Sequence, residues 1–262
     1  MAEKKTLSAL MLGDVCGQPG LRALFLSLGG LRKDLKADVV VVNGENAADG
    51  FGLSVGQMNQ LFSMGVDVIT SGNHIWQQDD LRPVLDSESR LLRPANYPEG
   101  APGHGMCVVS TPVCPVAVIN LQGRLDMPQT DDPFRKGLSL VQQARRQTPV
   151  ILVDFHAEHT DEKEALGFYL DGKVSAVVGT HTHVATLDAK ILPHGTAYQT
   201  DLGFTGPKGS VIGSEPDVSI RKQLTQLPLR NPIRDAEAEI NGVLVEIDVE
   251  SGKALSIQRV CR

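Results

Sequence analysis

The sequence has few cysteines, and their spacing forms no recognisable pattern. The four cysteines among 262 residues stand at positions 16, 107, 114 and 261, with no C-x-x-C pair. Disulfide frameworks and structural zinc sites depend on such spacing, so neither is predicted. A reducing, cytoplasmic setting is therefore the expected location.

Long hydrophobic runs are also missing. Residues 1–5 lead into a run of only seven residues, 6–12, and no later apolar stretch has the length that a bilayer requires. The sequence therefore predicts no targeting segment and no membrane span.

Positive charge is in deficit, because 25 lysines and arginines face 31 acidic residues and leave a net charge of −6. Sequence-independent binding of nucleic acid depends on cations that neutralise phosphates, so general nucleic-acid binding is not expected. A small phosphate-bearing ligand remains compatible with this balance, and the sequence also allows a homo-oligomer.

The chain has enough apolar residues for a sizeable core. Its length and its 41% hydrophobic content suit one large α/β domain or two small ones. No repeat, low-complexity tract or linker divides it. We therefore expect a single domain over residues 1–262.

Short apolar runs alternate with segments of helical spacing along most of the chain. The expected strands cover residues 6–12, 39–42, 66–69, 106–110, 116–121, 150–153, 174–178, 188–192, 196–200, 239–249 and 254–260. The expected helices cover residues 21–31, 54–64, 77–85, 132–146, 162–170 and 218–227, while residues 201–217 resemble a long loop. The last two strands should form a hairpin at the edge of a sheet.

Polar side chains follow five of the buried-type strands, where each strand ends. They are Asp14, Glu45, Asn73, His156, and the pair His181 and His183. Ligands of open α/β sheets bind beyond the carboxyl ends of the strands, so these side chains are expected to meet in one crevice. Taken separately they have simpler interpretations: Gly-Asn-His as a turn, and His-x-His as two residues on one strand face.

Together the six side chains are two carboxylates, one amide and three imidazoles, without a thiolate. Such a set suits manganese, iron or zinc better than magnesium, which prefers oxygen and water. Six ligands exceed what one catalytic ion needs. Two ions roughly 3.5 to 4 Å apart, bridged by a carboxylate, would use them all and would serve an in-line displacement at phosphorus.

These motifs, in this order, resemble those of a known superfamily. The matching blocks are Gly13-Asp14, Asn43-Gly44-Glu45-Asn46, Gly72-Asn73-His74, Asp154-Phe155-His156 and Gly179-Thr180-His181-Thr182-His183. They are similar to the motifs of the calcineurin-like metallophosphoesterases, and more closely to the YmdB-like subfamily, known for phosphodiesterase activity on cyclic nucleotides. The similarity covers nearly the whole chain. It implies an α/β fold in which a metallophosphoesterase-type β-sandwich is flanked by helices, in four αββα layers.

The resemblance also implies two sets of metal ligands with Glu45 as the bridge. Asp14, Glu45 and His183 would bind one ion, with Asn46 as a further ligand. Glu45, Asn73, His156 and His181 would bind the other. The sequence departs from the wider superfamily at two positions: Cys16 replaces a histidine ligand, and Glu45 replaces the usual bridging aspartate. Cys16 could itself ligate the first ion, but we interpret it as a packed neutral thiol.

The resulting hypothesis is a dinuclear phosphodiesterase with two divalent or mixed-valence ions of iron, manganese or zinc. A metal-bridging hydroxide would attack a phosphate diester, with a 2′,3′- or 3′,5′-cyclic nucleotide as the expected substrate, and His74 would protonate the leaving oxygen. Two alternatives use the same site: a phosphomonoesterase or protein phosphatase, and a metal-containing, nucleotide-binding regulatory protein with little turnover.

Residues that bind the rest of the substrate are not assigned by the sequence. Arg93, Arg124 and Lys208 stand in loops that could reach a phosphate, although a solvated charge is the default interpretation for each. Trp76 is interpreted as a packing residue. Asp154 and Glu158 are candidates for orienting His156.

Overall fold

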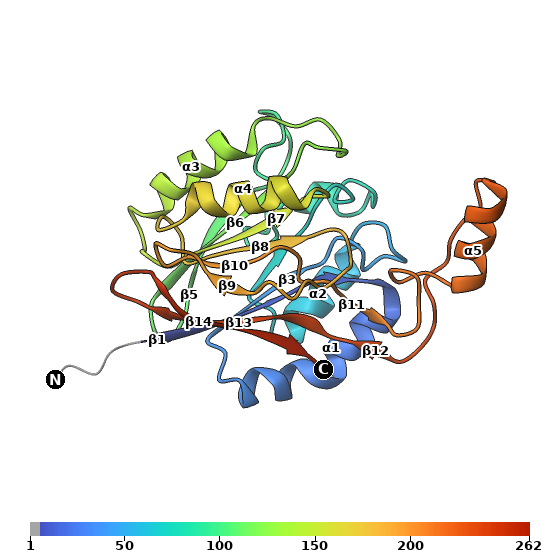
Figure 1. The fold of residues 1–262 in the computed structure, drawn as a ribbon, viewed down its shortest axis with the longest axis horizontal. Helices are drawn as coiled ribbons and strands as arrows, with labels where there is room; N and C mark the ends of the chain where they lie inside the picture. Colours follow the sequence, from blue (N-terminus) through green and yellow to red (C-terminus); the bar gives the residue numbers. More distant parts are fainter. Residues whose placement is uncertain (1–5) are drawn as a thin grey trace.

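Two large β-sheets stack face to face, with helices on both outer sides (Figure 1). This arrangement is seen in a computed structural model that describes residues 6–262. The expectation that residues 1–5 carry no targeting segment lies outside the described residues. Within them, no helix is long and apolar enough to cross a membrane.

The helices and strands follow one another in the order that the sequence predicts, with a few exceptions. The strands are β1 (Thr6–Leu12), β2 (Asp14–Val15), β3 (Val39–Asn43), β4 (Val68–Thr70), β5 (Met106–Ser110), β6 (Pro115–Gln122), β7 (Ile151–His156), β8 (Ala176–Thr180), β9 (Lys190–Ile191), β10 (Ala197–Gln199), β11 (Phe204–Pro207), β12 (Ala238–Glu239), β13 (Asn241–Asp248) and β14 (Ala254–Cys261). The helices are α1 (Gly17–Asp34), α2 (Val55–Ser63), α3 (Pro133–Ala144), α4 (Thr160–Leu170) and α5 (Pro216–Thr225), with a 3₁₀ turn at Arg82–Val84.

The first sheet has the strand order β14-β13-β1-β3-β4, in which β1, β3 and β4 are parallel. Its side chains alternate between two apolar clusters, as strand geometry requires. On β1, Leu10 and Leu12 pack with α1 and α2, whereas Leu7, Ala9 and Met11 pack with the second sheet. Both faces of the sheet are therefore buried.

The second sheet has the order β5-β6-β7-β8-β10-β9, with β6, β7, β8 and β10 parallel. On β7, Leu152 faces the first sheet, while Ile151 and Val153 pack with α3 and α4. The layers therefore run helix, sheet, sheet, helix, and the predicted αββα sandwich is confirmed. A small third sheet, β12-β11-β2, lies beside them.

Local sequence signals place two helices well. Ser54 caps α2 with a complete capping box in which Gln57 is the partner, and Asp132 caps α3 through the backbone N–H groups of Phe134 and Arg135. The expected strands 106–110 and 116–121 correspond to β5 and β6, which pair with each other in antiparallel fashion.

Three sequence predictions are wrong. Residues 77–85 form turns and one short 3₁₀ turn instead of a helix, and Pro83 within it lacks a backbone donor. Residues 201–217, predicted to be a long loop, contain the strand β11. Its partners β2 and β12 are distant from it in sequence. In the C-terminal hairpin only β14 is an edge strand, because β13 lies between β14 and β1.

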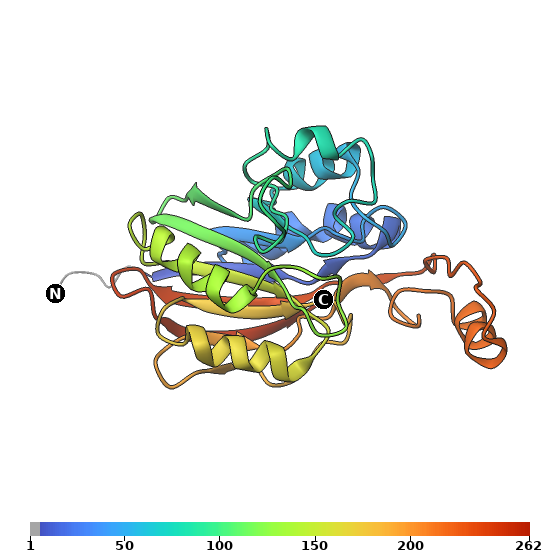
Figure 2. The same ribbon diagram turned by 90° about the horizontal axis from the view of Figure 1, so that it is seen from above.

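Segment 208–237, between β11 and β12, forms an arm that carries α5. Both ribbon views show α5 projecting away from the layered body (Figures 1 and 2). A backbone bridge from Ser214 to Ile233 joins the outgoing and returning parts of the arm, and a second bridge, from Ser214 to Val211, closes a turn within the outgoing part. The arm is therefore a folded extension of the body.

Candidate metal centre

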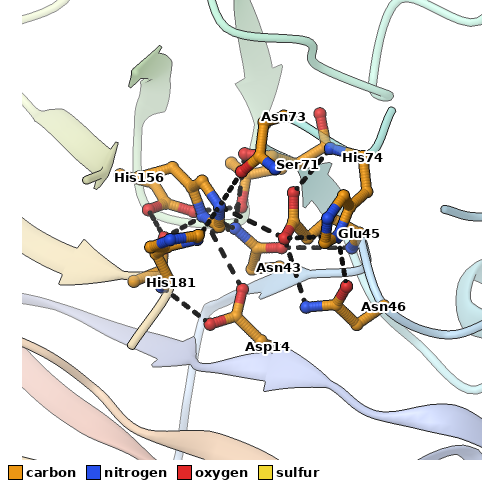
Figure 3. A network of polar contacts seen from close by, with 12 residues as sticks. Asp14, Asn43, Glu45, Asn46, Ser71, Asn73, His74, His156 and His181 are labelled. Carbon is orange, nitrogen blue, oxygen red and sulfur yellow. Dashed lines mark hydrogen bonds and ion pairs between the residues drawn. The ribbon is translucent and has the colours of Figure 1, made fainter. Parts of the chain in front are cut away.

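The polar residues at the strand ends meet in one place, as the sequence predicts. Figure 3 shows Asp14, Glu45, Asn73, His156 and His181 pointing toward one another from both large sheets. Asp14 follows β1, Glu45 and Asn73 follow β3 and β4, His156 ends β7, and His181 follows β8. The carboxyl ends of the central strands thus supply the whole cluster.

The tightest part of the cluster surrounds Nε2 of His156. This nitrogen lies 3.1 Å from Oδ1 of Asn73, 3.0 Å from Nδ1 of His181 and 3.2 Å from Oε1 of Glu45. Ligand atoms of Glu45, His156 and His181 all lie within 4.8 Å of one another. The four residues predicted to share the second ion are therefore brought together.

The residues predicted for the first ion lie near one another with wider spacing. Nε2 of His183 is 3.9 Å from Oδ2 of Asp14, and Nδ1 of His183 donates to the carbonyl of Ile212 at 2.8 Å. Because Nδ1 is engaged, Nε2 is the nitrogen of His183 that faces Asp14.

Asn46 lies in the same cluster, with its amide turned in a definite direction. Its Nδ2 lies 3.2 Å from Oε1 of Glu45 and 3.0 Å from Nε2 of His183, and its Oδ1 accepts from Nδ1 of His74 at 2.8 Å. In this orientation the amide oxygen is engaged in the hydrogen bond with His74. The prediction that Asn46 is a further metal ligand requires the amide to turn over.

His74 points away from the neighbouring Asn73 and holds Glu45 with two groups. Its backbone N–H donates to Oε2 of Glu45 at 3.2 Å, and its Nδ1 lies 3.3 Å from Oε1 of the same carboxylate. Nε2 of His74 has no hydrogen-bond partner among residues 6–262, and the ring packs against Phe51 with centroids 5.0 Å apart. This nitrogen is the one available to a substrate.

His156 is held by a relay of buried polar groups. Its Nδ1 donates to Oγ1 of Thr180 at 2.9 Å, and that hydroxyl donates to Oδ1 of Asp154 at 2.8 Å. Asn43 also donates to Asp154, at 3.1 Å. Asp154 therefore orients His156 through Thr180, whereas Glu158 lies 3.1 Å from Nε2 of His181 and orients that ring instead.

A test of this relay is Thr180→Val, which removes the hydroxyl and keeps a similar shape. Loss of such an outer contact typically lowers metal affinity roughly 10- to 100-fold, and we expect that loss in a metal titration of the folded variant. Thr148→Val is the matched control, because it also removes a buried hydroxyl, one that donates to the carbonyl of Pro115 at 2.7 Å, away from the site. Equal metal affinity in wild type and Thr180→Val would contradict the relay.

The loop that carries His181 and His183 has an unusual backbone. Both residues have positive φ angles, 106° and 63°, which non-glycine residues seldom adopt. The buried carboxylate of Asp201 accepts from the backbone and hydroxyl of Thr182 at 3.2 and 2.9 Å, and Lys163 donates to it at 2.6 Å. The buried ion pair of Asp201 and Lys163 therefore fixes the loop that carries His181 and His183. The sequence prediction missed Asp201, although it directly follows an expected strand.

A cavity of about 540 Å³ opens in front of the cluster. Glu45, His74 and His181 line one part of it, and Lys222 and Arg230 of the arm line another. This volume is within the range of small-molecule sites, roughly 300 to 1,000 Å³. The cavity is therefore large enough for an organic group as well as a phosphate.

The residues that sequence inspection singled out for phosphate contact are not among those lining this cavity. Arg93 donates to backbone carbonyls of its own loop, Lys208 lies 3.2 Å from Glu237, and Arg124 lies 3.9 Å from Asp132. Trp76 packs edge-on against Tyr97, as predicted. The aromatic side chain in the cavity is Phe51, which the sequence prediction missed.

The sequence of the chain is similar to those of known proteins. The sequence profile of the family described as "YmdB-like protein" matches residues 10–260. The chain belongs to the YmdB-like family. A 2′,3′-cyclic-nucleotide 2′-phosphodiesterase of Bacillus subtilis (strain 168) is 45% identical over 251 residues, which are 96% of this chain and 95% of that protein.

Two solved structures extend the comparison. A hypothetical protein from Thermus thermophilus superposes with a TM-score of 0.90 at 40% identity, over 98% of this chain and 99% of that one. The NAD nucleotidase of Haemophilus influenzae shares the fold at 12% identity with a TM-score of 0.57, over 98% of this chain and 56% of that one. The prediction of a phosphoric ester hydrolase is confirmed at the level of the class by the name of the Bacillus relative.

The charges of this YmdB-like site favour a cation. Burial raises the pKa of Asp14 to about 6 despite the nearby histidines. Burial acts to lower the pKa of His156, but Glu45 and Asp14 outweigh it and raise that pKa to about 9. Burial, and then His156, lower the pKa of His181 to about 3. A metal ion would compete for the carboxylates with the proton on His156, since ligation needs a neutral imidazole.

Two further features fit a metal ion. Oδ1 of Asp14 is buried without a hydrogen-bond partner, which is costly for a carboxylate oxygen unless a cation satisfies it. A Cβ at Gly72 would overlap the ring of His156 and the carboxylate of Glu45, so the absence of a side chain there keeps the space open. The donor set of oxygen and nitrogen atoms thus forms a candidate site for divalent metal.

Cys16 stands at the edge of this site as a neutral group. It is buried, and burial followed by the charge of Asp14 raises the pKa of its thiol to about 12. A thiol must lose its proton to become a good ligand. This supports the interpretation of Cys16 as a packing residue.

Proposed function

We propose that this YmdB-like chain is a calcineurin-like metallophosphoesterase, folded as a single domain, that hydrolyses a phosphate diester with two bound metal ions. The observation that carries the proposal is the convergence of seven polar side chains in one cluster, part of which lines the cavity. They are Asp14, Glu45, Asn46, Asn73, His156, His181 and His183. The substrate we propose is a 2′,3′- or 3′,5′-cyclic nucleotide, since the 45% identical Bacillus relative is named for the 2′,3′ class.

Glu45 is the residue that joins the two ligand sets. Its Oε1 lies 3.2 Å from His156 in one set and 3.2 Å from Asn46 in the other. The proposed metals are iron, manganese or zinc, because the donors combine carboxylate and amide oxygens with imidazoles and no thiolate is available. When bound, such ions activate water as a nucleophile and neutralise charge on the phosphate oxygens.

His74 supplies the proton that the reaction needs. Hydrolysis forms a bond from the water oxygen to phosphorus and breaks the bond from phosphorus to the leaving oxygen, which is left with negative charge. Glu45 lies 3.3 Å from Nδ1 of His74 and remains its partner in either orientation of the Asn46 amide, so Nε2 can deliver a proton to that oxygen. The product is a phosphate monoester.

The proposed location is a reducing, cytoplasmic compartment. All four cysteines are free, and Cys16 and Cys107 are buried where burial raises the pKa of each thiol to about 12. None of the four is arranged for disulfide bonding.

The test is an assay of the purified protein, loaded with defined amounts of each metal, on three substrate classes. We expect hydrolysis of cyclic nucleotides to exceed that of linear diesters and of monoesters, and to disappear with a chelator. A preference for monoesters would support the phosphomonoesterase alternative. Nucleotide binding without turnover at full metal content would support the regulatory alternative.

A further inference from the structure

The arm contributes positive charge to the catalytic cavity. Lys222, in the last turn of α5, and Arg230, on the returning segment, both line the cavity that contains Glu45 and His181. Both side chains are exposed, and neither has an ion-pair partner among residues 6–262. Although the net charge of the chain is −6, the cavity is thus lined by two cations without an ion-pair partner in the described part of the chain.

Two other cations of the arm are paired elsewhere. Arg234 lies 3.3 Å from Glu215, and Lys208 lies 3.2 Å from Glu237. Lys222 and Arg230 are therefore the cations of the arm that both line the cavity and are free to meet a ligand in it. A cation near the end of a helix also interacts with the helix dipole, which accounts for part of the placement of Lys222 but not for Arg230.

The arm is tied to the metal centre at its base. Nδ1 of His183 donates to the carbonyl of Ile212, and the side chain of Ile233 lies against Gly17 and Gly50. Asn231 and Ser219 bond to each other and join the returning segment to α5. These contacts hold the base of the arm beside the cluster and join the two segments that carry Lys222 and Arg230.

Apolar and aromatic side chains make up another part of the cavity wall. Phe51, which is 56% exposed, faces it with an aromatic ring, and Ile212, Leu229 and Ile233 complete the wall. A planar base can stack on such a ring, because every base presents a π face. The cavity wall thus combines residues of the metal centre, two cations and an aromatic surface that suits a nucleoside.

We propose that the cavity selects nucleotides that carry a second phosphate, which Lys222 and Arg230 bind while the scissile phosphate lies at the metal centre. The proposal rests on the proposed function for the position of the scissile group. The second phosphate has two possible sources: a 5′-phosphate on a cyclic mononucleotide, or the internal phosphodiester of a short oligonucleotide that ends in a cyclic phosphate.

The test compares three substrates that share one nucleoside 2′,3′-cyclic phosphate. The first has a free 5′-hydroxyl, the second a 5′-phosphate, and the third is the matching dinucleotide. We expect wild-type protein to prefer at least one phosphate-bearing substrate by roughly tenfold in kcat/KM, mainly through KM, and this preference should fall as salt is added. The substrate that is preferred shows whether the second phosphate is a 5′-phosphate or an internal phosphodiester.

The variant is the double substitution Lys222→Gln with Arg230→Gln, and the readout is the ratio of kcat/KM values. We expect this ratio to fall to about one. Arg221→Gln is the matched control, because it removes one charge from the same helix at an exposed residue that does not line the cavity. A wild-type ratio of one, or a ratio that survives in the double variant, would overturn the proposal.

A binding measurement separates this proposal from the proposed function. Calorimetry of wild type should show tighter binding of a nucleoside 3′,5′-bisphosphate than of the 3′-monophosphate, and the double variant should lose the difference. Protein that hydrolyses no diester but keeps this difference would refute the proposed function alone. Equal binding of both nucleotides by wild type would refute the second-phosphate site.

Discussion

Glu45→Gln is expected to remove both metal and activity from the protein. The Glu45 carboxylate touches both predicted ligand sets and is wholly buried, and His156 beside it holds its pKa well below the usual range although burial acts to raise it. An uncharged amide cannot replace a bridging carboxylate that neutralises two cations. We expect elemental analysis to find less than half of the wild-type metal, and diester hydrolysis to fall by roughly 10³-fold or more.

Thermal unfolding gives a readout of the same variant that does not depend on activity. A ligand present at about 100 times its Kd stabilises the folded state by about 2.7 kcal/mol, so chelation should lower the Tm of wild type by roughly 5 to 10 °C. The Tm of Glu45→Gln should respond to chelator much less than that of wild type. Glu164→Gln, which alters a surface pair with Lys190, should behave as wild type. Full metal content in an active Glu45→Gln protein would exclude the bridge.

His74→Ala is expected to lower turnover in a way that depends on the leaving group. A positioned general acid typically contributes roughly 10² to 10⁴ in rate, and only when the departing oxygen needs a proton. A nucleoside alkoxide needs one, whereas a nitrophenolate does not. Hydrolysis of a nucleotide diester should therefore fall by that factor, and hydrolysis of a nitrophenyl diester should fall far less, provided that chemistry limits both rates.

The metal content of His74→Ala shows whether its loss of turnover comes from proton transfer or from loss of metal. We expect His74→Ala to keep its metal, because Asn73 is the predicted ligand of this pair and its Oδ1 lies 3.1 Å from Nε2 of His156. His159→Ala is a suitable control, since that histidine pairs with Asp126 at the surface. Similar losses on the two substrates would remove His74 from the role of acid.

Much of the site could be predicted because its residues follow a local rule. Glu45, Asn73 and His156 each stand at the end of a short apolar run, and parallel strands bring such ends together whatever the length of chain between them. The caps of α2 and α3 were predictable for a similar reason, since Ser54 and Asp132 act on backbone groups within a few residues.

The features that the sequence prediction missed depend on contacts between distant segments. β11 is a strand because it pairs with β2 and β12, and its own residues have no strand periodicity. Lys222 and Arg230 reach the cavity only through the path of the arm, which no local pattern encodes. Asp201 is different, because the rule of strand ends applied to the run before it would have predicted it.

Gly72 has a consequence for how the gene can change. Every single-nucleotide change in a glycine codon that alters the amino acid, apart from stop codons, introduces a residue with a Cβ. At this position that atom would occupy the space between His156 and Glu45. A relative that keeps the metal centre is therefore expected to keep glycine at position 72. In relatives that have lost this glycine, we expect the neighbouring ligand residues to be no longer under selection.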